Sequence, residues 1–306
     1  MKDKKIDAKK INHKIIYALL LIATITSASV IILIIFQIAE RGIRPLFSTY
    51  LVDGISVKIN VFEFLFGLKY GGRFFYGIGY LIINTIFNVF LSIVIATPIG
   101  ILTAIFIVKL SPKGLSHVFQ IIVEMLAAVP SIVIGMFGQG FIASILRKIT
   151  SITGNLSLLN TILVLSIMIL PTITMMSVTA LKGVPKNIEE GSLALGATEI
   201  QTTFNVTLKA AKSGIFAGII LSVGRALGEA TAVSLVSGAS GSGPNFNFFK
   251  TTNMLASRIL IGFKEVSEGS LDFEIRFTMG LVLIIVILFF NIVLNKIKNK
   301  VANYEI

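Results

Sequence analysis

Six long apolar runs divide the chain, and shorter polar segments between them hold most of its charged residues. A helix needs about 20 apolar residues to span the hydrocarbon core of a bilayer. The runs show neither the alternation of a half-buried strand nor the short periodic blocks of a water-soluble helix. The pattern therefore predicts an all-α polytopic membrane protein with six transmembrane helices, at 15–39, 79–108, 118–146, 157–181, 211–237 and 276–295.

The first run follows a basic segment, as the apolar core of a signal peptide does. Its apolar stretch from Ile15 to Ile38 is too long for that role, and no small-x-small cleavage site follows it, so we expect an uncleaved span. The expected organisation is a sequence of tails, loops and spans. It runs as a cytoplasmic tail 1–14, a first transmembrane helix 15–39, an extracytoplasmic segment 40–78, a core of five helices 79–295 containing a cytoplasmic loop 182–212, and a tail 296–306.

Basic residues favour one orientation of these spans, because Lys and Arg are retained on cytoplasmic loops. They are denser in the two tails and in the segments 109–117 and 182–210 than in the segments of the other side. The other side comprises 40–78, 147–156 and 238–275, which are longer and also carry Asp and Glu. Both termini are therefore expected in the cytoplasm, which agrees with an even number of spans.

Composition excludes several classes of protein. Hydrophobic residues make up 55% of the chain and charged residues 14%, with a mean hydropathy of +0.91, so lipid is the expected solvent. The net charge of +12 lies in short segments between apolar runs and forms no continuous face, which argues against a nucleic-acid partner. The chain has no cysteine, and His13 and His117 stand alone in basic segments, so no disulfide, metal or cofactor is expected on it.

An intramembrane protease or lipid transferase is an alternative from another class. It would need a nucleophile or a metal constellation, and neither a His-Glu-x-x-His nor a Gly-x-Ser-x-Gly pattern occurs. No Walker motif occurs either, so any ATP would be used on another polypeptide. The stretch 238–250 is rich in Gly, Ser and Asn and predicts a flexible loop.

Away from the ends of the predicted spans, the ionisable residues are Glu124, Arg225 and Glu229. Such groups cost a few kcal/mol at membrane depth, so they are normally paired, turned to the bundle interior or functional. Arg225 and Glu229 are four residues apart, which predicts that they share a helix face and touch. They form either a structural salt bridge or a site on the path of an anion, since a guanidinium matches two phosphate oxygens.

Glu124 and three prolines suggest that the spans are bent. Glu124 lies two turns into the third span, near Pro130, and either reaches the membrane interface, caps a freed backbone amide or serves the function. Pro98, Pro130 and Pro171 each remove a backbone donor and kink a helix. Small residues in the fifth span predict close helix packing. They are Gly214, Ala217, Gly218 and Ser222.

The loop 182–212 reads as two short amphipathic helices joined at Gly196, a natural helix stop. Asn187 is the expected cap of the first, with Glu189 and Glu190 in its first turn. This spacing resembles the EAA signature of binding-protein-dependent ABC importers, a Glu followed six residues later by Gly and then by an apolar end. The matching positions are Glu190, Gly196, Ala197, Val206 and Leu208, with Gly191-Ser192 in place of Ala-Ala and Lys209 in place of the proline.

Over the rest of the chain, the resemblance is to one particular branch of this importer family. Four segments look like the PstC-type phosphate permease in the same order, and the match covers nearly everything beyond the first span. They are FEFLFG (62–67), AVPSIVIGMFG (128–138), IMILPTIT (167–174) and GRALGEATAV (224–233). In that family the Arg-Ala-Leu-Gly-Glu run is matched residue for residue by 225–229, and the resemblance implies that both of its charged residues serve phosphate transport.

The resemblance implies a type I ABC importer permease that moves inorganic phosphate inward by alternating access. The implied partners are a homologous PstA-type permease, a dimeric ATPase that carries ATP and magnesium, and an extracytoplasmic phosphate-binding protein. The loop around Glu190 and Gly196 would couple the permease to the ATPase. Two alternatives stay open: an importer for another oxyanion such as sulfate or molybdate, and a channel, which would need no such loop.

Overall fold

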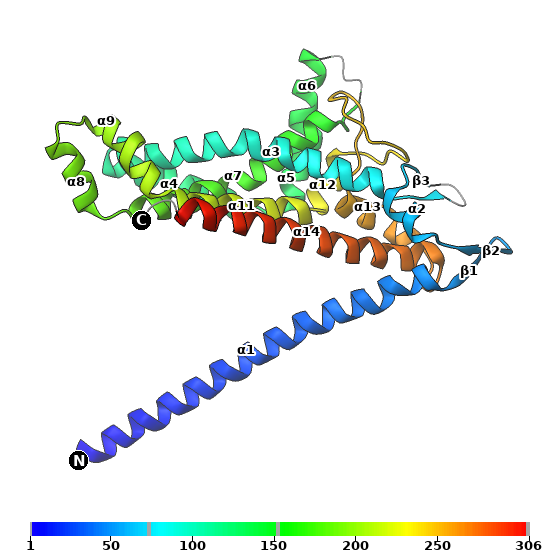
Figure 1. Ribbon diagram of the computed structural model, residues 1–306, viewed down its shortest axis with the longest axis horizontal. Helices are drawn as coiled ribbons and strands as arrows, with labels where there is room; N and C mark the ends of the chain where they lie inside the picture. The colour runs from blue at the N-terminus through cyan, green and yellow to red at the C-terminus, as the bar shows by residue number, and fades with distance from the viewer. Residues whose placement is uncertain (1, 72–74, 151–153, 304–306) are drawn as a thin grey trace.

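The computed structural model describes residues 2–71, 75–150 and 154–303, most of which are helical. Figure 1 shows an elongated bundle with helices α8 and α9 projecting at one end and the strands β1 and β2 at the other. We call these two ends the loop end and the hairpin end. The start of α1 and the end of α14 both lie towards the loop end, as an even number of crossings requires (Figure 1).

The predicted six spans are confirmed in number, with different bounds. Within the described residues, five helical stretches are long and apolar enough to cross a membrane. A pair of segments, Glu199–Ala210 and Lys212–Gly228, is bent by 64° and meets the same criteria together, so the number is six when the pair is taken as one broken span. The five single stretches are Ile15–Phe47 in α1, Gly79–Leu110 in α3 with its π-helical end η1, Ser131–Ile149 across α5, η2 and α6, Leu158–Lys182 in α7, and Leu271–Lys300 in α14.

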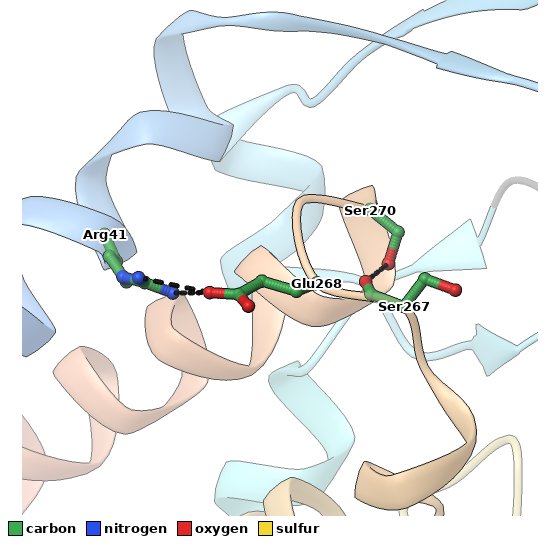
Figure 2. A network of polar contacts seen from close by, with 4 residues as sticks. All are labelled: Arg41, Ser267, Glu268 and Ser270. Carbon is green, nitrogen blue, oxygen red and sulfur yellow. Dashed lines mark hydrogen bonds and ion pairs between the residues drawn. The ribbon is translucent and has the colours of Figure 1, made fainter.

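Helix α1 (Lys2–Phe47) is continuous, so the predicted tail, first span and start of the outer segment form one element. It diverges from the bundle and touches α14 (Leu271–Asn303) near its own C-terminal end (Figure 1). Gly42 permits this contact, since a Cβ there would lie 2.8 Å from the Phe277 carbonyl oxygen. Arg41 also forms an ion pair with Glu268, in the segment just before α14, at 3.4 Å (Figure 2).

The hairpin end has more structure than its sequence suggested. Asp53 and Gly54 both have positive φ, at 51° and 80°, and form the two-residue turn of an antiparallel hairpin. Asn60 caps the short helix that follows, accepting from the Phe62 amide at 3.0 Å. The elements are β1 (Thr49–Val52), β2 (Ile55–Lys58), α2 (Val61–Phe66), β3 (Tyr70–Gly71) and β4 (Phe75–Tyr76). Burial raises the pKa of Tyr76, and Asp272 adds to the rise.

The centre of the bundle consists of α3 (Gly79–Ile105), α7 (Leu158–Lys182) and α11 (Lys212–Gly228), with α14 against α11. Small residues set the α7–α11 distance, as the sequence predicts. A Cβ on Gly214 would lie 2.6 Å from the Ala180 Cβ, and one on Gly218 would lie 2.6 Å from the Met176 Cβ. Helices that approach this closely gain van der Waals contact that larger side chains would prevent.

Two predicted spans are broken, so the bounds 118–146 and 211–237 are wrong. The first divides at Val129–Pro130 into α4 (Lys113–Ala128) and α5 (Ser131–Phe137), because Pro130 has no amide to donate and holds Val129 extended. The second divides after Gly228, and α12 (Thr231–Val236) continues it. After α5 the chain runs on through η2 (Gly138–Ile142) and α6 (Ala143–Ile149).

The segment between α12 and α13 (Leu255–Leu260) is a loop, as predicted, and hydrogen bonds fix its course. The Tyr80 hydroxyl donates to the Ser240 carbonyl at 2.9 Å, and the Leu158 amide donates to the Lys250 carbonyl at 2.8 Å. Buried Asn84 accepts from the Asn245 amide at 3.1 Å. The loop thus belongs to the hairpin end rather than moving freely above it. The turn η4 (Phe263–Glu265) then leads into α14.

Candidate functional site

Arg225 lies in the last turn of α11, where a positive side chain is stabilised by the negative end of the helix dipole. It is half-buried, and its Nη1 donates to the hydroxyl of Thr172 at 3.2 Å. Thr172 follows Pro171 within α7, which continues through that proline. The guanidinium therefore bridges two of the three central helices.

Glu229 does not occupy the place that its spacing predicts. The α-helix ends at Gly228, and Glu229 takes an extended conformation with φ −74° and ψ 112°. Its Oε1 accepts from the Ala232 amide at 3.0 Å, so the carboxylate caps the start of α12. The predicted contact across one helical turn is wrong, since no ion pair joins Arg225 and Glu229 in the structure as described.

The separation of the pair changes what the arrangement can do. A half-buried guanidinium whose described partner is a neutral hydroxyl retains donors for another group. Its preferred partner is an oxyanion, because a planar guanidinium binds two oxygens in parallel. Glu229, the first residue after α11, bonds instead to the backbone of α12.

The two broken helices meet beside this region. A Cβ on Gly135 of α5 would lie 2.8 Å from the Cα of Ala232 in α12. Ile134 is buried in the same cluster as Ala232 and Val236. Pro130, at the start of α5, and Glu229, at the start of α12, therefore begin two short helices that pack on each other. Interrupted helices at membrane depth are tolerated where the freed backbone lies within protein or lines a cavity.

Glu124 lies on α4, on the other side of the Pro130 break, and is exposed. The Gln120 side chain donates to it at 2.9 Å and accepts from Lys182 at 3.1 Å. Lys182 ends α7 at the loop end of the bundle. These contacts therefore place Glu124 towards the membrane interface at that end and away from Arg225. Among the described residues no backbone amide donates to Glu124, so of the three alternatives the contacts favour the membrane interface over an amide cap.

The loop after α7 has the predicted two-helix form. It contains α8 (Lys186–Ala194), then Gly196 with φ 86°, then α9 (Glu199–Thr202). That left-handed conformation favours glycine, which explains the residue at the bend. Glu190 is exposed, and Leu195 at the tip is 91% exposed. Half-buried Ala197 turns the chain back by donating its amide to the Ser192 carbonyl at 3.3 Å.

Two details of this loop differ from prediction. Pro185 rather than Asn187 occupies the cap position of α8, with no side-chain hydrogen bond. The second helix is short and passes into a π-helical turn, η3 (Thr203–Thr207), and then into α10 (Leu208–Ala210). Val206 and Leu208 are half-buried, and Leu208 packs on the apolar cluster at the loop end of the bundle. The bundle side and the exposed side of the loop are thus distinct.

Two polar contacts were not anticipated from the sequence, the hydrogen bond of Arg225 to Thr172 and an ion pair between Lys109 and Glu189. Thr172 reads as an ordinary hydroxyl in a membrane helix, and Lys109 and Glu189 read as solvated loop charges. A pair of residues that meet only through the fold gives no signal in a single sequence. Within the described residues, no group of three or more His, Cys, Asp or Glu side chains is placed to hold a metal ion.

Comparisons with known proteins bear on this arrangement. Residues 96–302 match the family model described as the inner membrane component of binding-protein-dependent transport systems. A probable ABC transporter permease, YqgH of Bacillus subtilis, is 34% identical over 90% of this chain and 89% of its own length. The phosphate transport system permease PstC of Haemophilus influenzae is 31% identical, covering 76% of this chain and 82% of its own. PstC 1 of Mycobacterium tuberculosis is 30% identical over 74% of each chain.

Solved structures share the fold at lower identity. A permease chain of a bacterial alginate ABC transporter, solved with its pentasaccharide-bound periplasmic protein, superimposes with a TM-score of 0.64 at 16% identity over 94% of both chains. A chain of the inward-facing MetNI methionine ABC transporter superimposes with a TM-score of 0.55 at 20% identity, covering 74% of this chain and 94% of that one. These likenesses establish a common architecture for the helical bundle.

Proposed function

Because the chain belongs to the inner membrane components of binding-protein-dependent transport systems, we propose that it is the permease subunit of an ATP-driven importer of inorganic phosphate. The coarser part of this statement rests on the family itself. The chain is a multi-pass protein of the plasma membrane, with the fold of a type I importer permease, and a transport subunit rather than an enzyme.

Phosphate is the proposed substrate for two reasons. Several relatives at about 30% identity are named phosphate permeases, although YqgH carries only the general name. The observation that carries the proposal is the Arg225 guanidinium, half-buried at the end of α11 and bonded to the neutral Thr172. A hydrogen-bonding cation inside the bundle suits a tetrahedral oxyanion that has left its hydration shell.

Transport would proceed by alternating access between two global states. A dimeric ATPase that carries ATP and magnesium would act on the α8–α9 loop, a PstA-type permease would complete the pathway, and an extracytoplasmic phosphate-binding protein would deliver the anion. Arg225 would hold phosphate weakly, because a tight site would prevent its release on the far side. Glu229 at the neighbouring helix break would limit the time that the anion stays, by like-charge repulsion.

Another oxyanion, sulfate or molybdate, is the second candidate substrate, because a guanidinium binds all three. At neutral pH phosphate carries a proton that sulfate lacks, and the Glu229 carboxylate can accept a hydrogen bond from it. That difference favours phosphate near the break. The distinction is measurable as competition for uptake in the assembled transporter.

The first test replaces Arg225 in the complete transporter, reconstituted in vesicles with its binding protein. We expect Arg225→Ala to lower phosphate uptake by roughly a hundredfold, the loss of about 3 kcal/mol that one charged hydrogen-bonding partner supplies. Arg225→Lys should retain part of the activity, because it keeps the charge and loses the planar fork.

A matched control is Arg44→Ala, which removes an exposed arginine at the hairpin end. Uptake by Arg225→Ala near the level of this control would remove Arg225 from the pathway. Sulfate that inhibits uptake as strongly as phosphate would instead contradict the choice of substrate while leaving the role of Arg225 intact.

A further inference from the structure

An ion pair ties the α8–α9 loop to the end of α3. Lys109 lies in η1 (Phe106–Leu110), the π-helical continuation of α3, and its Nζ contacts the Oε1 of Glu189 in α8. The two side chains are 21% and 22% exposed. A pair so far withdrawn from water is less screened than a surface salt bridge, so its attraction is stronger.

A third element joins the same carboxylate. The hydroxyl of Thr207, which is fully buried in η3, donates to Glu189 Oε1 at 3.1 Å. Glu189 thereby links α8 to both η1 and η3. A further contact within the loop, between the hydroxyls of Ser192 and Thr202 at 3.0 Å, braces α8 against α9. We call Lys109, Glu189 and Thr207 the loop clamp.

The loop clamp is the main fixed contact between α8 and the bundle. The chain bends on both sides of α8, and α8 itself is exposed. The chain bends at Gly183 on leaving α7, and it bends again at Ala211, where the two segments of the sixth crossing meet at 64°. None of the residues of α8 is buried. The backbone can rotate at a bend, whereas the Lys109–Glu189 ion pair keeps α8 and the end of α3 together. A displacement of α8 is therefore expected to displace the end of α3 as well.

We propose that Lys109 and Glu189 are positioning residues that transmit the movement of the α8–α9 loop to α3 during transport. The inference rests on the proposed docking of this loop on an ATPase. Both residues act through the helices that they join and neither touches the transported anion. The end of α3 then moves with the loop as one body, while α7 and α11 turn about their bends.

Charge reversal tests the pairing. Lys109→Glu and Glu189→Lys each place two like charges together, and we expect each to lower the phosphate transported per ATP hydrolysed by roughly tenfold, within the usual range of coupling between sites. The double variant restores an opposite pair and should return most of the ratio. Unchanged ratios in both single variants, or a double variant no better than either, would overturn the proposal.

A distance measurement serves if a single variant fails to fold. The chain has no native cysteine, so spin labels can be placed at Leu102→Cys on α3 and Leu193→Cys on α8, both at exposed positions and away from the tip at Leu195. With the clamp intact, the distance between the labels should be the same in the nucleotide-free and vanadate-trapped transporter. A change of more than about one helical turn, roughly 5 Å, would show that the loop moves independently of α3.

Docking itself is checked separately. Leu195→Cys should form a cross-link to the ATPase subunit in the assembled transporter. A cross-link together with unaffected charge-reversal variants would contradict the loop clamp alone. The absence of a cross-link in an otherwise unchanged transporter would contradict the docking proposed for the loop, and with it the inference.

Discussion

The hairpin end and the loop end of the bundle are held together in different ways. At the hairpin end, buried polar side chains bond to backbone groups of distant segments: Arg276 donates to three carbonyls near α13, and Asn84 bonds to the loop that follows α12. At the loop end, α8 buries no residue and depends on the loop clamp. The hairpin end is fixed by many buried polar contacts, whereas α8 at the loop end is attached at a few points.

The difference shows where the chain resists deformation. Buried hydrogen bonds to backbone groups are costly to break, because each leaves a desolvated group unpaired. A loop with exposed helices and bends at both ends opens at little cost. The hairpin end is therefore suited to holding its shape, and the loop end to receiving force. Substitutions at the two ends should then differ in their effect on stability.

The largest loss of stability is expected from Arg276→Met. Arg276 Nη1 donates to the carbonyl oxygens of Arg258, Ile259 and Ile261 at 3.3, 2.7 and 2.8 Å. Its Nε is buried without a partner, which already offsets part of the gain. We expect the free energy of unfolding to fall by about 3 kcal/mol, because charged hydrogen bonds are lost together. Calorimetry in detergent measures this loss.

The exposed Arg44 at the same end provides the control for Arg276→Met. Arg44→Met should change the unfolding free energy by less than about 0.5 kcal/mol, as surface substitutions usually do. Equal effects of the two substitutions would contradict the idea that buried contacts fix the hairpin end.

A smaller loss is expected from Asn84→Leu. Its side chain donates to the Asn253 carbonyl at 3.3 Å and accepts from the Asn245 amide at 3.1 Å. Leucine matches the size but leaves both backbone groups unpaired, so we expect a loss of about 2 kcal/mol. Hydrogen exchange should rise at the Asn245 amide, which loses its acceptor, and Asn187→Leu on exposed α8 should leave both measurements unchanged.

The smallest loss of stability is expected from Leu195→Ser at the tip of the loop. The side chain is 91% exposed, so the unfolding free energy should change by less than about 0.5 kcal/mol. If the tip docks on the ATPase, stimulation of ATP hydrolysis should nevertheless fall several-fold, since apolar contact area is lost. Leu110→Ser, outside the α8–α9 loop, is the control, and equal stimulation in both variants would exclude the tip as a docking site.

The long apolar runs were sufficient to predict the number of crossings, because the membrane requires about 20 apolar residues in each. The amphipathic pattern on either side of Gly196 also predicted the two-helix loop, because a glycine there permits the left-handed conformation that ends a helix. The number of spans and the two-helix loop could be predicted because each depends only on residues that are neighbours in the chain.

The helix breaks could not be predicted, because similar local sequences behave differently. Pro98 and Pro171 lie within continuous helices, whereas Pro130 ends one. The break before Glu229 contains no proline, and its carboxylate caps α12 instead. The outcome at each site depends on neighbouring helices that satisfy the freed backbone groups. For the same reason, the partner of Arg225 proved to be Thr172, which is distant in sequence.

Helix α1 leaves the bundle at an angle from its contact at Gly42 and Phe277 (Figure 1). The side chains from Ile15 to Phe36 are exposed and mostly apolar. Two diverging apolar surfaces in a bilayer enclose a wedge that water cannot enter, so acyl chains or another apolar surface must fill it. The area that this subunit occupies in the membrane is therefore larger at the loop end than at the hairpin end, and shortening α1 would make its outline more nearly cylindrical.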